Sequence, residues 1–82
     1  MRWMATIKFN PEQRANIGPL VPAEQEHVKA QMSKKELDAI YISNERLTVW
    51  LVMPGTSQEE VEQKLKSYPL YPYMQYELTP LS

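Results

Sequence analysis

The end of the chain decides how the rest is arranged, and it reads Ser67-Tyr68-Pro69-Leu70-Tyr71-Pro72-Tyr73-Met74-Gln75-Tyr76-Glu77-Leu78-Thr79-Pro80-Leu81. Proline has no backbone N–H and keeps the residue before it out of the helical conformation, so the preceding helix must end near Ser67. Pro69 and Pro72 then stiffen a short connection. The stretch therefore predicts the end of a helix, a rigid aromatic corner and a final strand.

Residues 73–79 alternate as a strand does, because successive side chains point to opposite faces of a sheet. One face would carry apolar residues and the other mostly polar ones: Met74, Tyr76 and Leu78 against Tyr73, Gln75, Glu77 and Thr79. We expect Pro80 to end this strand, because proline cannot donate to a sheet ladder.

Length and composition predict one domain spanning residues 1–82. A domain of this size buries a thin core and commonly relies on disulfides, a metal or partner subunits. The sequence has no cysteine, and its single histidine, His27, does not make a histidine-rich metal site. Association with further copies is the remaining way to bury more surface.

The charge balance excludes several partners. Nine basic and ten acidic residues are interspersed and give a net charge of −1. Nucleic-acid-binding proteins normally show a basic face or a positive excess, so we expect no nucleic-acid partner. No apolar run is long enough to span a membrane, and the first residues lack a signal-peptide pattern. The composition thus predicts a soluble, cytoplasmic protein with no membrane partner.

Hydrophobic periodicity predicts further strands at 2–9, 37–42 and 46–53, and helices at 23–35 and 58–67. Together with the last strand, they follow the order strand, helix, strand, strand, helix, strand. This is the ferredoxin-like α+β arrangement, a βαββαβ sandwich. A four-stranded antiparallel sheet would carry the two helices on one face.

The sequence also makes predictions about two connecting segments. Residues 11–22 stay ambiguous, because a helical turn at 12–17 would be interrupted by Gly18-Pro19. Residues 43–45 have the length of a hairpin loop, in which Asn44 can adopt a positive φ.

The helices carry expectations as well. Helix 23–35 would bury a narrow stripe formed mainly by Val28 and Met32, with His27 on a solvated face. Helix 58–67 would begin with a capping box and bury Val61, Leu65 and Tyr68. The spacing fits the box at either of two pairs: Ser57 with Glu60, or Thr56 with Glu59.

The middle strands predict self-association, because they are apolar on both faces. Leu47, Val49, Leu51 and Met53 oppose Trp50 and Val52, and Ala39 and Tyr41 oppose Ile40 and Ile42. Two small helices cover one face only, so the other would expose more apolar surface than soluble monomers usually do. We expect at least a homodimer whose sheets pack face to face, a dimeric α+β barrel.

Residues 65–81 resemble the C-terminal signature of the muconolactone Δ-isomerase family, which reads roughly S-L-P-L-F-P-Y-M-D-I-E-V-T-P-L. The matching residues are Ser67, Pro69-Leu70, Pro72-Tyr73-Met74 and Glu77-Leu78-Thr79-Pro80-Leu81. The resemblance implies a ferredoxin-like fold, dimers formed through the sheets and, in some members, larger rings. It also implies a proton shift within an unsaturated lactone, performed without a metal or an organic cofactor.

Such a proton shift needs a base beside an acidic C–H bond and a donor that stabilises the developing enolate. By the resemblance, Glu77 corresponds to the family's strand carboxylate, so we expect it to be the base. Tyr41 or Tyr73 would be the donor.

Three further residues are expected to bind the substrate. Lys8 and Thr6 share a face of the first strand, which neighbours the last strand in a ferredoxin-like sheet. Lys8 would hold an anionic group such as a lactone carboxylate, and Thr6 and Gln75 would complete the polar surface around Glu77.

Two departures from the family pattern keep a second function open. Gln75 stands where the family has aspartate, and Ala39-Ile40 stand where it has Trp-Arg, so the cation of that strand is missing. The alternative is a non-catalytic oligomeric protein that keeps the scaffold and binds a small ligand without converting it.

Overall fold

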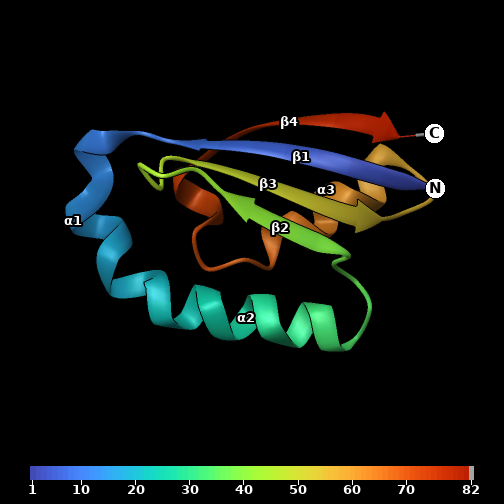
Figure 1. Cartoon of the computed structure of the whole chain (residues 1–82), viewed down its shortest axis with the longest axis horizontal. Coiled ribbons are helices and arrows are strands. Elements are labelled where there is room, and N and C mark those ends of the chain that lie inside the picture. Colours follow the sequence, from blue (N-terminus) through green and yellow to red (C-terminus); the bar gives the residue numbers. More distant parts are fainter. Residues whose placement is uncertain (82) are drawn as a thin grey trace.

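The computed structural model describes residues 1–81. Its strands and helices are β1 (Arg2–Phe9), α1 (Arg14–Ile17), α2 (Val21–Ser33), β2 (Ala39–Ile42), β3 (Thr48–Pro54), α3 (Gln58–Lys66) and β4 (Met74–Leu81). Short 3-10 turns at Pro11–Gln13, Gly18–Leu20 and Tyr71–Tyr73 connect some of them. Within residues 1–81 the strands form one antiparallel sheet in the order β2-β3-β1-β4 (Figure 1). The ferredoxin-like α+β fold is confirmed, whereas association through the sheet stays a prediction.

The register gives the sheet one apolar and one mixed face. Ala5 of β1 lies opposite Leu51 of β3 and Leu78 of β4, and all three face the helices. The next residue, Thr6, lies opposite Trp50 and Glu77 on the other face. The alternation expected for the first, third and last strands is therefore confirmed.

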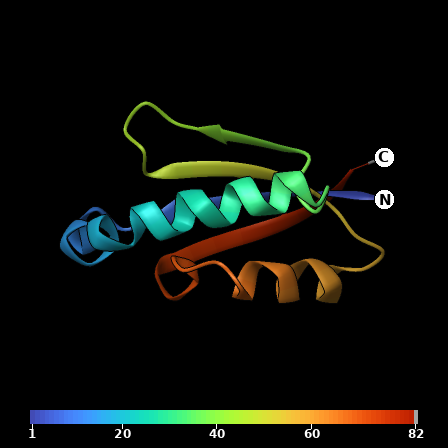
Figure 2. The ribbon, with the colours of Figure 1, turned by 90° about the horizontal axis from the view of Figure 1, so that it is seen from below.

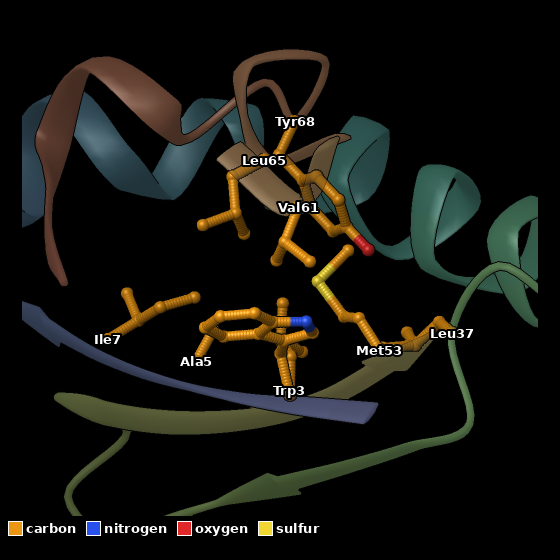
Figure 3. Packing of buried hydrophobic residues seen from close by; sticks show 9 residues of the cluster. Trp3, Ala5, Ile7, Leu37, Met53, Val61, Leu65 and Tyr68 are labelled. Carbon is orange, nitrogen blue, oxygen red and sulfur yellow. The ribbon is translucent and has the colours of Figure 1, made fainter. Parts of the chain in front are cut away.

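Helices α2 and α3 cover the same face of the sheet, and α2 runs along its length (Figure 2). Figure 3 shows side chains of the strands rising toward others from α3 and the corner after it. The indole N–H of Trp3 donates to the backbone oxygen of Gly55 at 3.2 Å. Without this bond the buried N–H would have no hydrogen-bond partner. The buried apolar cluster consists of Trp3, Ala5, Ile7, Leu37, Leu51, Met53, Val61, Leu65 and Tyr68.

Helix α3 begins with the capping box that the sequence predicts at Ser57 and Glu60. The Ser57 hydroxyl accepts the N–H of Glu60 at 3.2 Å. The Glu60 carboxylate, however, reaches one residue beyond the cap and accepts the N–H and the hydroxyl of Thr56, at 2.7 and 2.6 Å. These bonds favour the charged carboxylate and lower the pKa of Glu60.

The β2–β3 connection is longer than the sequence predicts. Strand β3 begins at Thr48, because Arg46 has a left-handed φ of 62° and donates its N–H to the oxygen of Ser43 at 2.9 Å. The positive φ expected at Asn44 is thus adopted by Arg46. Strand β2 begins at Ala39, since Leu37 turns its side chain into the core ahead of the strand.

The expectation that Pro80 ends the last strand is wrong. Strand β4 continues to Leu81, and Pro80 lies opposite Trp3. Because β4 is an edge strand with one free side, a residue without an N–H can stand there and leave the ladder intact.

Helix α2 presents a different face from the one expected. Met32 is 43% exposed, while Gln31 is buried and Val28 packs against the core. The ambiguous segment before it is almost continuously helical, because Gly18 has helical dihedrals and Pro19 sits in the first turns of a 3-10 helix, where its missing N–H costs no bond. Arg14–Leu20 therefore leads directly into α2.

We expect Gly55→Ala to destabilise the fold by about 1–3 kcal/mol, the usual cost of overpacking a tight core. A Cβ at this buried glycine would lie 2.7 Å from Cγ2 of Val61, whose branched side chain is itself fully buried. Gly18→Ala is the matched control: its Cβ would meet nothing within 4 Å, and its helical dihedrals suit alanine. The control should be neutral or stabilising by up to about 1 kcal/mol. Urea unfolding of both variants checks this, and equal midpoints would contradict it.

Candidate functional site

The structure places the expected site residues mainly on the helix-free face of the sheet. Tyr41, Trp50, Thr6 and Glu77 form one row across β2, β3, β1 and β4. Tyr41 and Glu77 stand at opposite ends of this row, roughly 14 Å apart at about 4.8 Å per strand. One protomer therefore does not bring this pair together.

The remaining expected residues lie near the Glu77 end of that row. Lys8 lies opposite Gln75, so Glu77 is its diagonal neighbour, within reach of a long side chain. Glu77, Gln75 and Lys8 are all exposed. Tyr73 is half-buried in the turn that precedes β4. Lys8, Thr6, Gln75 and Glu77 thus form one polar, solvated surface.

A cleft of about 880 Å³ lies on the opposite side of the sheet, beneath α2. Part of its lining comes from α1 and the β2–β3 turn, and these two segments lie at the end of the sheet away from the start of β1 (Figure 1). Its wall is largely apolar and includes Phe9, Val28, Ile40, Val49, Leu70 and Met74. A large apolar cleft with a few polar groups is the usual form of a small-molecule site.

Of the two glutamates that line this cleft, Glu24 is half-buried and Glu45 is exposed. The position of Glu24 on α2 is three residues after Val21 and four before Val28, so helical spacing turns it toward the sheet with these apolar neighbours. Its Oε1 accepts the backbone N–H of Leu70 at 3.2 Å. Burial raises the pKa of Glu24 above its ordinary value, and the bond from Leu70 partly opposes this.

The proline corner provides the Leu70 N–H and also holds the next turn of α2. His27 packs edge-on against Tyr68, with ring centroids 4.5 Å apart, and its Nε2 lies 2.9 Å from the hydroxyl of Ser67. Ser67 donates its own hydroxyl proton to the oxygen of Lys64 at 2.6 Å, so it accepts a proton from His27. His27 is therefore half-buried against the corner, whereas the sequence predicted a solvated face.

This geometry excludes Ser67 as a nucleophile activated by His27, because Nε2 carries the proton of their bond. Tyr68 is buried, and desolvation raises the pKa of its phenol. The three residues His27, Ser67 and Tyr68 join α2 to the corner, and through it they fix where Glu24 meets Leu70.

Sequence reasoning missed the residues that line the cleft. The signal for Glu24 was present, since Val21 and Val28 flank it at helical spacing. Arg14 and Arg46 also line the cleft. They lie in two connections far apart in the sequence, and only the fold brings these together at one end of the sheet.

Residues 1–81 contain no group of three or more histidine, cysteine, aspartate or glutamate side chains placed to hold a metal ion. None of the helices in this range is both long and apolar enough to cross a membrane.

Comparison with known proteins finds a similarity of structure. No family model and no curated protein sequence matches the chain. The fold is similar to that of 5-chloro-2-hydroxyhydroquinone dehydrochlorinase from Burkholderia phenoliruptrix AC1100, solved in complex with 2,5-dihydroxybenzoquinone. The TM-score is 0.81 at 11% sequence identity, over 100% of this chain and 94% of that chain. At this identity the similarity concerns the fold, and it agrees with the ferredoxin-like arrangement of the resembled family.

Proposed function

We propose that the chain binds a small unsaturated lactone or related organic acid in the cleft beneath α2 and shifts a proton on it without a cofactor. The observation that carries this proposal is Glu24, a partly buried carboxyl with a raised pKa in a largely apolar cleft. A perturbed acid in the main cleft of a protein is the usual mark of a proton-transfer group.

The chemistry requires one group that takes a proton from carbon and returns it to another carbon. The Glu24 carboxylate would remove the proton, the electron pair of the C–H bond would move into the conjugated system as an enolate, and protonated Glu24 would deliver the proton to the new carbon. No atom or electron is gained or lost overall. A raised pKa makes the Glu24 carboxylate a stronger base, and the Leu70 bond to Oε1 leaves Oε2 free for the proton.

The open sheet face supports two further parts of the proposal. Tyr41 is 60% exposed there, and Trp50, Val52 and Met4 are half-buried around it, which favours packing against a second copy. A partner sheet would also desolvate the row that ends at Glu77. Glu77 therefore stays the second candidate base, with Tyr41, Tyr73, Lys8, Thr6 and Gln75 in the roles expected of them from the sequence.

Incubating the protein with muconolactone in deuterated buffer tests the proposal, with proton NMR following loss of substrate and deuterium incorporation. We expect Glu24→Gln to lower the exchange rate by about 100-fold or more, the usual contribution of a general acid–base group. Glu26→Gln is the matched control, because it makes the same change on an exposed position of the same helix.

The same experiment with Glu77→Gln separates the two candidate bases. Loss of exchange in Glu77→Gln and not in Glu24→Gln would move the reaction to the open sheet face. Binding of muconolactone without turnover or exchange would exclude the reaction and support a protein that only binds its ligand. Absence of binding would overturn both functions.

The stability of the protein should also depend on the protonation state of Glu24. Its pKa is raised in the folded state, so the stabilisation by the uncharged carboxyl is present below the unfolded pKa and lost as the pH rises through the folded pKa. Glu24→Gln does not titrate. We therefore expect the stability of the variant, relative to the native chain, to increase as the pH rises above the ordinary pKa of a glutamate. Urea unfolding at several pH values measures this, and a difference independent of pH would contradict it.

A further inference from the structure

We propose that Arg14 and Arg46 select the ligand of the cleft by binding a single carboxylate at its mouth. The inference rests on the proposed function for the position of the ligand and adds its chemical class: a flat, mostly apolar molecule with one negative charge. From the sequence, the anion is expected at Lys8 instead, on the other face of the sheet.

Arg14 and Arg46 line one cleft because the fold brings two segments, far apart in the sequence, to one end of the sheet. Arg14 begins α1, directly after the turn that follows β1, and Arg46 lies in the turn between β2 and β3. Figure 1 shows both segments at the end of the sheet opposite the start of β1. Both residues line the same cleft, and both are exposed to solvent.

The charges at the cleft favour a monoanion. The lining carries three cations, Arg14, Lys29 and Arg46, and two carboxyl groups, Glu24 and Glu45. With Glu24 ionised, the count is three minus two, or +1; with Glu24 protonated it is three minus one, or +2. The proposed reaction needs the ionised Glu24 as its base, so the first state is the one that meets the ligand. A ligand with one carboxylate balances its charge of +1, whereas a dianion would exceed it.

Neither arginine is neutralised by the protein. Within the described residues the one ion pair joins Arg2 to Asp38, away from the cleft lining. A guanidinium presents parallel N–H donors that match the two oxygens of a carboxylate, and apolar surroundings strengthen such bonds. The apolar wall formed by Val28, Ile40 and Met74 would then receive the body of the ligand.

The backbone conformation of Arg46 allows a variant that removes its side chain without disturbing the turn. Its φ of 62° lies in the region that glycine adopts without steric cost, and its N–H bond to Ser43 does not involve the side chain. Arg46→Gly therefore removes the guanidinium and keeps the turn. Arg14→Gln tests the other cation. Lys66→Gln removes the same charge from the outer surface of α3 and serves as the control.

Calorimetric titration with benzoate and with benzamide, a neutral molecule of similar shape, tests the inference. We expect the native chain to prefer benzoate by about tenfold, the typical gain from a hydrogen bond to a charged group. Arg46→Gly and Arg14→Gln should each weaken benzoate binding several-fold and leave benzamide unchanged, while Lys66→Gln should change neither. Added salt should reduce the preference, because both cations are solvent-exposed.

The outcomes separate this inference from the proposed function. Equal binding of benzoate and benzamide, unaffected by either arginine variant, would overturn the carboxylate site and leave the cleft as a site for neutral molecules. A benzoate preference that Lys66→Gln reduces as much as Arg46→Gly would show a general charge effect and overturn it as well. Binding of neither molecule would remove the cleft site and the carboxylate site together.

Discussion

The hydrogen bond from the Leu70 N–H to Glu24 is the contact on which the functional part of this structure depends. It exists because two prolines hold the chain in a fixed corner between α3 and β4, so that a backbone donor points out of the corner toward α2. Ser67 and Tyr68, at the start of the same corner, hold His27 one helical turn further on. Helix α2 is thereby attached to the end of the chain at two successive turns.

This attachment explains where the cleft lies. The corner fixes α2 from the α3 side, while the segment that leads into α2 begins at the far end of the sheet, beyond β1. At that end the apolar side chains do not fill the space between the helix and the strands, so a cleft remains. Glu24 lies at the boundary between the core and this cleft. The same corner that completes the fold therefore positions Glu24, a carboxyl whose burial raises its pKa. Stability and proposed chemistry share a single structural cause.

The fold was predictable from the sequence because each element has a local signal. Alternation over residues 2–9 and 73–79, the capping box at Ser57 and the prolines of the corner each specify their structure within a few residues. The errors arose where context overrides local preference. Pro80 continues a strand because that strand is at an edge, and Arg46 adopts the positive φ that asparagine would adopt more easily.

The candidate site was less predictable, because it is formed by residues that only the fold brings together. Glu77 stands out in the sequence through a motif, and the structure leaves it exposed on the open face. Glu24 belongs to no motif. Its hydrogen bond comes from Leu70, 46 residues away, and its burial comes from the apolar wall of the cleft. Long-range contacts of this kind leave no pattern in the local sequence.

The most direct test of the account is to map where a small aromatic acid binds, by following backbone amide shifts of labelled protein during titration with benzoate. We expect the largest amide shift changes at Val28, Ile40 and Leu70, around the cleft, and none on the open sheet face. Changes centred on Thr6, Trp50 and Glu77 instead would contradict it and place the working site on the face that the sequence first indicated.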